Sequence, residues 1–281
     1  MILFPRTIQI ETTILCNSHC VFCPHNEMDR GPKVMEEWVW KKIIDESRGR
    51  SIVYRPFMIN EPFVDPKMPE IIRYIKQDPT AKVEFNSNGH FSVKTDIKAL
   101  LEAGIDYVRF SIDGFTEETF KQSGRGGTFD QIVKNIHAFI DERNRQGSEC
   151  KIEVRMIDLE CNRHEQKDYV EYWSQFANSA TVTELYEWPW SGQTEPHRKP
   201  CPKIRYEMFF MVDGQATICC WDAFGKSLIG DVKLNTVEEI WLGETNQRYR
   251  EYLNKGERDN IVLCSRCDAY KKFDFSNWEG Y

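Results

Sequence analysis

The chain has 281 residues, of which 41% are hydrophobic and 29% are charged. These fractions are typical of a globular protein and exclude a collagen-like, low-complexity or wholly disordered chain. Lys and Arg number 37 against 44 Asp and Glu, and the net charge of −7 argues against nucleic acid as a partner. The length fits one large barrel-like domain followed by a small one.

The start of the chain lacks the features of a targeting sequence. It is apolar for only four residues before Pro5 and Arg6, and no apolar run approaches the roughly 18 residues that span a bilayer. We therefore expect a cytoplasmic protein with no membrane partner. In a reducing compartment, ten cysteines are more typical of metal ligands than of disulfides.

Segments of strand and helix character alternate along the first 190 residues. The predicted strands are residues 7–13, 51–59, 81–89, 105–114, 150–158 and 180–188. The predicted helices are residues 33–48, 68–77, 95–103, 127–147 and 164–176. This alternation favours a parallel sheet with right-handed crossovers. Because six such units close only part of an eight-unit barrel, residues 1–190 are predicted to be a partial (β/α)6 TIM-like barrel of the α/β class.

The last part of the chain has a different pattern. A loop rich in Pro and polar residues is followed by a hairpin over 205–221, with Asp213-Gly214 as its turn. A helix with Val237, Ile240 and Trp241 on one face comes next. We expect residues 191–281 to form a small α+β domain.

The first three cysteines directly follow the first predicted strand. Cys16, Cys20 and Cys23 have the spacing C-x3-C-x2-C. Three thiolates can hold three irons of a [4Fe–4S] cube and leave the fourth iron open, whereas ferredoxin-type clusters use four cysteines. A zinc site completed by His19 or His25, or a set of free thiols, is the alternative.

The C-x3-C-x2-C spacing, with Phe22 before the third cysteine and Pro24 after it, resembles the radical S-adenosylmethionine (SAM) superfamily. The resemblance covers nearly the whole chain. It implies that the open iron chelates SAM and that one electron cleaves SAM to methionine and a 5′-deoxyadenosyl radical, which abstracts hydrogen from a substrate. It also implies an electron donor such as flavodoxin or ferredoxin.

Weaker matches to the family's SAM-binding motifs follow the later strands. Asn60-Glu61-Pro62 stands where the family has Gly-Gly-Glu-Pro, and the resemblance places the Glu61 carboxylate on the SAM ammonium. Asn88 lies in a turn that resembles the family's Thr-Asn-Gly. Ser111 begins a Ser-Ile-Asp-Gly stretch that resembles Ser-Leu-Asp-Gly, whose serine contacts the SAM ribose.

Three further residues are implied to contact SAM. Phe22 is the expected neighbour of the adenine. Arg155 on the fifth strand, or Arg125 in the sequence SGRGG, is expected to pair with the methionine carboxylate. All of these positions lie at the carboxyl ends of strands, where barrel active sites form.

A second group of cysteines lies in the C-terminal part. Four thiolates in a domain with little core suit a metal centre, and a zinc ribbon is the alternative to an iron–sulfur cluster. The pattern, with residues 230–241 (GDVKLNTVEEIW), resembles the SPASM domain in its one-cluster form, twitch. The resemblance implies one auxiliary [4Fe–4S] cluster, held by Cys201, Cys219, Cys264 and Cys267. Cys150 and Cys161 are expected to be ordinary thiols.

The cysteine layout resembles the aminocyclitol (2-deoxy-scyllo-inosamine) dehydrogenase type within the family. This implies oxidation of a secondary alcohol on a small sugar or aminocyclitol, with the auxiliary cluster as electron acceptor. Glu11 is the candidate base, with Glu184 and Glu187 as alternatives. Tyr186, Trp188, Trp190 and Trp221 are candidate walls of the substrate pocket, although aromatic residues clustered near a domain junction are more often packing residues.

Three other functions stay open. In an epimerase of a sugar or peptide, Cys220 donates a hydrogen atom to the substrate radical, but a spare thiol packed in the core fits equally well. A peptide maturase is less favoured, because we expect no leader-recognition domain before the first strand. A non-catalytic iron–sulfur or zinc scaffold leaves the open iron without a purpose.

Overall fold

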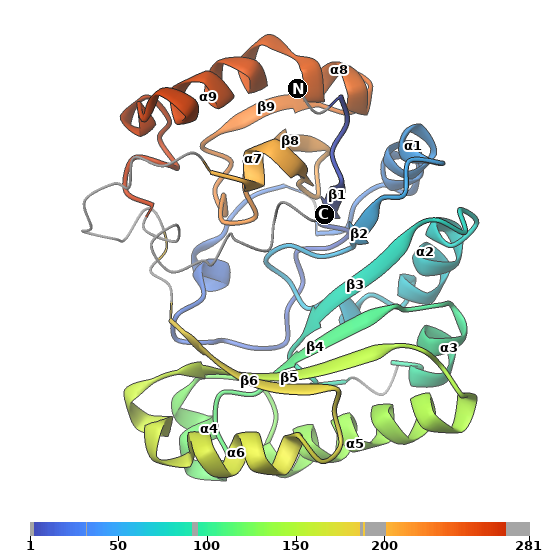
Figure 1. Ribbon diagram of the computed structural model, residues 1–281, viewed down its shortest axis with the longest axis vertical. Helices are drawn as coiled ribbons and strands as arrows, with labels where there is room; N and C mark the ends of the chain where they lie inside the picture. Colours follow the sequence, from blue (N-terminus) through green and yellow to red (C-terminus); the bar gives the residue numbers. More distant parts are fainter. Residues whose placement is uncertain (1–2, 32, 92–94, 186–187, 189–200, 268–281) are drawn as a thin grey trace. The chain divides into compact units, whose positions relative to one another are not determined.

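The computed structural model describes residues 3–31, 33–91, 95–185, 188 and 201–267 (Figure 1). The chain divides into two compact units. The first contains Met1–Thr12, Met28–Ile59 and Tyr186–Tyr281, and the second contains Thr13–Glu27 and Asn60–Leu185. The predicted boundary at residue 190 lies outside the described residues. Each unit has its own strands and its own hydrophobic core.

The second unit is a parallel sheet covered by helices. Its strands are, in spatial order, β3 (Lys82–Ser87), β4 (Tyr107–Ser111), β5 (Lys151–Asp158) and β6 (Ser179–Glu184). Its helices are α2 (Met68–Ile75), α3 (Ile97–Glu102), α4 (Glu117–Gln122), α5 (Phe129–Gln146) and α6 (Gln166–Trp173), with 3-10 turns η1 (Pro24–Glu27), η2 (Pro62–Val64) and η3 (Glu160–Glu165). The carboxyl ends of the four strands therefore share one edge (Figure 1).

The period-two pattern of these strands decides which face the helices cover. Phe85, Val108, Phe110 and Val154 are almost completely buried, whereas the alternate positions carry mostly polar side chains. A Thr128 N-cap begins α5, and Gly147, with a φ of 63°, ends it. The opposite face of the sheet carries the polar side chains, among them the ion pair of Arg109 with Glu153.

The first unit joins an antiparallel hairpin to parallel strands. Its strands are, in spatial order, β2 (Val53–Arg55), β1 (Thr7–Ile10), β7 (Glu207–Phe210), β8 (Gln215–Thr217) and β9 (Leu228–Asp231). Its helices are α1 (Glu37–Ser47), α7 (Lys203–Tyr206), α8 (Val237–Leu242) and α9 (Glu244–Lys255), with the 3-10 turn η4 (Arg258–Asn260). The predicted hairpin is confirmed, and Gly214 makes its turn with a φ of 91°.

The six strands of the predicted alternation are present, but several limits differ. The strand predicted over 51–59 is only Val53–Arg55, because the following residues turn toward η2. The helix predicted from residue 33 begins at Glu37. The sequence analysis did not assign α4, which has a capping box at Thr116.

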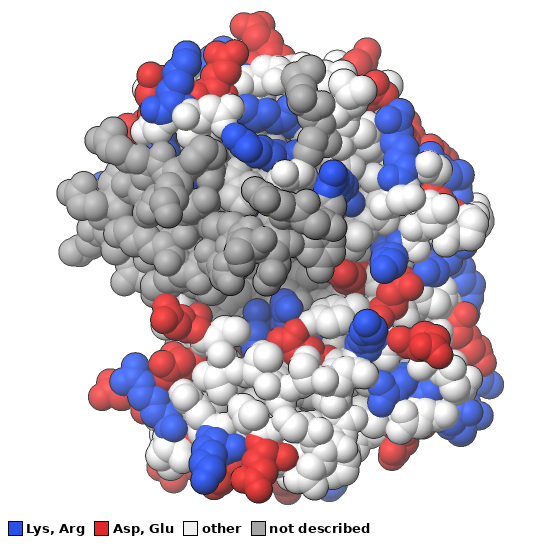
Figure 2. All heavy atoms as spheres, viewed as in Figure 1, with Lys and Arg blue, Asp and Glu red and all other residues white. Residues whose placement is uncertain are grey.

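Among the residues that the structure describes, no helix is long and apolar enough to cross a bilayer. On the face in Figure 2, Lys and Arg are interspersed with Asp and Glu over the described surface.

Candidate active site and cluster-binding loops

The three N-terminal cysteines lie on one loop, residues 13–23, which we call the cluster loop. The Cys16 thiol is close enough to Cys20 and Cys23 to interact with both electrostatically. Burial raises the pKa of Cys16 to about 12 and that of Cys23 to about 11. The surroundings disfavour free thiolates here, and a bound metal cation would offset that cost.

A glycine-rich segment, residues 123–127, lies against the cluster loop. The His19 amide donates to the Gly124 carbonyl at 3.0 Å, and the Gly126 amide donates to Ser18 Oγ at 3.0 Å. A Cβ on Gly126 would lie 2.0 Å from the Asn17 carbonyl oxygen, so a side chain cannot fit there. The glycines of SGRGG therefore allow its backbone to dock on the loop.

Asn88 ties the cluster loop to the end of β3. Its Nδ2 donates to Asn17 Oδ1 and to Ser18 Oγ, both at 2.8 Å. Its backbone amide donates to Glu61 Oε2 at 2.6 Å. Asn88 thus contacts both the loop of the three cysteines and the carboxylate expected at the SAM ammonium.

An ion pair between Asp113 and Arg125 holds the glycine-rich segment. Arg125 Nε and Nη2 lie 2.7 Å and 2.5 Å from Asp113 Oδ2, and the side chains are 8% and 0% exposed. Asp113 Oδ1 accepts from the Ile157 amide at 2.8 Å. Arg125 also interacts electrostatically with Cys20. Through Asp113, the ion pair links the ends of β4 and β5 to the glycine-rich segment that lies against the cluster loop.

Replacing Asp113 by Asn should lower the free energy of unfolding by about 3–5 kcal/mol, because Arg125 would be left as a buried unpaired charge. Anaerobic urea unfolding of the full chain measures this change. As a control, Lys98→Ala, which breaks an exposed pair with Glu102, should cost less than about 1 kcal/mol. Equal costs for the two variants would contradict the structural role of the pair.

Glu61 and Arg155 fit the two charges of a SAM amino-acid end. Glu61 is 2% exposed and accepts from Phe63 N, Ser87 Oγ and Asn88 N, but burial raises its pKa to about 7. It forms no ion pair with the described residues, so an ammonium group would compensate its charge.

Arg155 is the candidate for binding the opposite charge of SAM, its carboxylate. Burial lowers its pKa to about 10, and its Nε is buried without a partner among the described residues. Its Nη2 donates to Ser111 Oγ at 3.4 Å. Since Arg125 is already paired with Asp113, Arg155 is the better candidate of the two for a SAM carboxylate.

The remaining SAM candidates lie in the same unit. Ser111 is the last residue of β4 and is 6% exposed. Phe22 is half-buried, with its ring centroid 6.0 Å from Arg125 Cζ. Asn60 is half-buried and directly precedes Glu61. The second unit therefore holds all six SAM candidates.

The four C-terminal cysteines are brought together in the first unit. Cys201 interacts electrostatically with Cys219 and Cys264, and Cys264 interacts with Cys267. Burial raises the pKa of the Cys201 thiol, while the amides of Lys203 and Ile204 at the start of α7 oppose the shift. Four thiols gathered in this way suit the four corners of an iron–sulfur cluster.

Within the described ranges, no group of three or more His, Cys, Asp and Glu side chains is arranged to hold one metal ion. A [4Fe–4S] cube binds each thiolate to a different iron, so its ligands need not converge on one point. The cluster assignment therefore depends on which cysteines are close together and on the residues around them.

The Radical SAM superfamily model matches residues 10–152, which is just over half of the chain. The chain belongs to the radical SAM superfamily. A second family, the iron-sulfur cluster-binding domain SPASM, matches residues 201–268. The predicted fold class, a partial barrel followed by an iron–sulfur domain, is thereby confirmed, as are the predicted cofactors, iron–sulfur clusters and SAM.

Curated relatives match about half of the chain. A GTP 3',8-cyclase of Chlorobaculum tepidum is 27% identical over 47% of this chain and 41% of its own length. A probable GTP 3',8-cyclase of Methanococcus maripaludis is 30% identical over 48% of this chain and 46% of its own length. The chain thus spans less than half the length of these relatives.

Solved structures with bound AdoMet match nearly the whole chain. The structure of BtrN in complex with AdoMet and 2-DOIA is 16% identical, with a TM-score of 0.65 over 94% of this chain and 93% of BtrN. Native anSMEcpe with bound AdoMet is 13% identical, with a TM-score of 0.70 over 95% of this chain and 90% of that chain. At these identities the likeness shows a shared fold.

The candidate base of this radical SAM enzyme, Glu11, is held by three donors. Arg30 Nη1 and Nη2 lie 2.7 Å and 2.9 Å from its two oxygens, and the Val212 amide donates at 3.1 Å. Glu11 is fully buried. These contacts favour a structural role over proton transfer, because both oxygens are already engaged. Glu184 lies at the end of β6, and Glu187 lies outside the described residues.

The other catalytic and aromatic candidates lie in the first unit. Cys220 is half-buried beside Cys219, whose thiol it contacts. The Trp188 and Trp221 rings lie 5.7 Å apart at 55°. The aromatic candidates Tyr186 and Trp190 lie outside the described residues.

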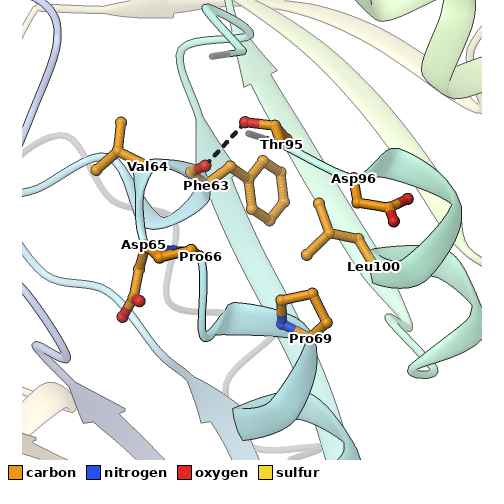
Figure 3. Close-up of a pocket in the computed structure, with 8 residues that line it drawn as sticks. All are labelled: Phe63, Val64, Asp65, Pro66, Pro69, Thr95, Asp96 and Leu100. Carbon is orange, nitrogen blue, oxygen red and sulfur yellow. Dashed lines mark hydrogen bonds between the residues drawn. The ribbon is translucent and has the colours of Figure 1, made fainter. Parts of the chain in front are cut away.

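A small cavity in the second unit is lined by residues of η2, α2 and α3 (Figure 3). Phe63 and Leu100 point toward each other, while the carboxylates of Asp65 and Asp96 point away. Thr95 Oγ1 donates to the Phe63 carbonyl at 3.0 Å. The cavity has a volume of about 40 Å³, which is too small for SAM and holds a few water molecules at most.

The residues that support the two groups of cysteines were not predicted from the sequence. Asn17 and Ser18 stand between the cysteines of the C-x3-C-x2-C pattern, and Asp113 belongs to a turn motif. The glycines of SGRGG were the available signal for the first group. For the second, no signal in the sequence singled out the buried Arg258.

Proposed function

We propose that this radical SAM enzyme oxidises a secondary alcohol of a sugar or aminocyclitol to a ketone. The observation that carries the proposal is the second gathering of cysteines, Cys201, Cys219, Cys264 and Cys267. A single auxiliary redox centre is what a net oxidation needs, since one electron must leave the substrate after hydrogen abstraction. An electron donor such as flavodoxin or ferredoxin would reduce the SAM-binding cluster.

The conversion is balanced by three losses from the substrate. A CH–OH group becomes C=O when its carbon loses a hydrogen atom, its oxygen loses a proton and the remaining radical loses an electron. The first cluster with SAM supplies the 5′-deoxyadenosyl radical that takes the hydrogen atom. In our assignment Cys16, Cys20 and Cys23 hold that cluster, Glu61 binds the SAM ammonium, and Arg155 binds its carboxylate.

The substrate class is supported by the fold neighbour with the fullest mutual coverage among those described above. BtrN was solved with AdoMet and 2-DOIA, and it matches over 94% of this chain and 93% of its own length. The GTP 3',8-cyclases match over less than half of their length, so they support the SAM chemistry more than the substrate. The cysteine layout favours the dehydrogenase type.

An experiment in heavy water separates oxidation from epimerisation. With an aminocyclitol or sugar substrate, SAM and reductant, we expect a ketone with no new carbon–deuterium bond at the reacting carbon, detected by mass spectrometry. Cys220→Ala should retain at least about half of the activity, because a hydrogen donor is not needed. Cys161→Ala is the matched control, since it also removes one half-buried thiol.

The epimerase gives the opposite pattern. Its product keeps the alcohol, carries deuterium from an exchangeable thiol, and is no longer formed by Cys220→Ala. That result would replace the oxidation that we propose, and the radical SAM assignment itself would stand.

A further inference from the structure

Arg258 is a buried cation beside the second group of cysteines. Only 2% of its surface is exposed. It interacts electrostatically with the thiols of Cys201 and Cys264. A guanidinium remains charged in proteins, so its burial at this place puts a permanent positive charge next to two of the expected cluster ligands.

Short turns connect Arg258 to Cys264 and Cys267 along the backbone. The Ile261 amide donates to the Arg258 carbonyl at 2.9 Å, the Cys264 amide to the Ile261 carbonyl at 2.9 Å, and the Cys267 amide to the Cys264 carbonyl at 3.2 Å. The fully buried Ile261, whose backbone is extended, lies between the turn of Arg258 and the turn of Cys264. Arg258 is therefore tied by the backbone to the segment that carries two of the expected cluster ligands.

Lys203 and Asp222 are further charged groups that interact with these cysteines in the described part of the chain. Lys203 interacts with Cys219 and Cys220, and its Nζ lies 3.2 Å from Glu207 Oε2. Asp222 interacts with Cys264, and its carboxylate accepts from Thr217 Oγ1, Lys226 N and Ser227 N. Both groups are fixed by their own partners, and they would remain unchanged when Arg258 is replaced.

We propose that Arg258 raises the reduction potential of the auxiliary cluster and so makes it a better acceptor for the substrate electron. Reduction adds one negative charge to a cluster that already carries four thiolates. A buried cation stabilises the reduced state more than the oxidised state, because its attraction grows with the cluster's negative charge. The inference rests on the proposed function, in which this electron comes from the substrate radical.

The test measures the midpoint potential by redox titration monitored by electron paramagnetic resonance. The full chain with Cys16, Cys20 and Cys23 changed to Ala, reconstituted with iron and sulfide, carries only the auxiliary cluster. Adding Arg258→Gln should increase the oxidised-to-reduced ratio at a fixed potential about tenfold, which is about 59 mV for one electron. Arg258→Lys, which keeps the charge, should shift the ratio by less.

The matched control is Arg248→Gln on α9. It removes the same charge from the same unit, but its side chain is 48% exposed and lies 4.0 Å from Glu244. We expect no change in the midpoint potential, because solvent screens this charge. An Arg258→Gln protein with full iron and sulfide and an unchanged potential would overturn the proposal.

If Arg258→Gln loses its cluster, Arg258→His provides a second test of the same charge. Between roughly pH 6 and 8, a histidine loses its charge, so the potential of this variant should fall as the pH rises, relative to the unsubstituted protein. Parallel pH profiles would refute the role of the charge. Because no substrate is present, this result is independent of the heavy-water experiment, which tests the reaction itself.

Discussion

Replacing Cys16, Cys20 and Cys23 together by alanine is expected to abolish 5′-deoxyadenosine formation and to remove about four irons per chain. The three thiols share one loop and interact with one another electrostatically, and we assign them as the ligands of the SAM-binding cluster. Iron and sulfide analysis measures the first effect, and chromatography of the anaerobic reaction with SAM and reductant measures the second.

The control for this variant is Cys161→Ala, which should keep both its iron content and its activity. Cys161 is half-buried on η3, outside both groups of cysteines. Reductive cleavage of SAM by the triple variant would show that the cluster is assigned to the wrong cysteines.

Replacing Cys264 and Cys267 by alanine is expected to remove the other set of about four irons and to lower the stability of the first unit. The two residues lie on consecutive turns after η4, and bound metal would hold this segment against Cys201 and Cys219. SAM cleavage should persist while ketone formation is lost. Iron analysis, thermal unfolding and product analysis measure these effects.

The matched variant is Cys220→Ala, which removes a neighbouring thiol that we do not assign as a ligand. It should keep the full iron content. A zinc ion without sulfide at Cys264 and Cys267 would refute the redox role and leave only a structural one.

The order of strands and helices was accessible from the sequence because hydrophobic periodicity and turn residues are local signals. The buried Phe85 and Val154 alternate with polar residues in their strands, and Asp213-Gly214 marks the hairpin. Ends of elements were less accessible, as β2 and the start of α1 illustrate. Tertiary contacts decide where a strand stops pairing, and no local pattern encodes them.

The spacing of the cysteines identified the candidate ligands, but it did not identify the residues that hold them in place. C-x3-C-x2-C is a local pattern, but the bond from Asn88 to Ser18 joins residues that are 70 positions apart. Similarly, Arg155 was one of two interchangeable arginines until the Asp113–Arg125 ion pair distinguished them. The pairing of distant polar groups depends on the folded arrangement, so one sequence could only propose alternatives.

The most direct test of the account is SAM cleavage by the unmodified chain, reconstituted with iron and sulfide and reduced without oxygen. We predict 5′-deoxyadenosine and methionine in equal amounts, with 5′-deoxyadenosine carrying deuterium from a substrate labelled at the alcohol carbon. If a protein with both sets of irons formed no 5′-deoxyadenosine under these conditions, the central claim, that the chain generates a substrate-abstracting radical from SAM, would be contradicted.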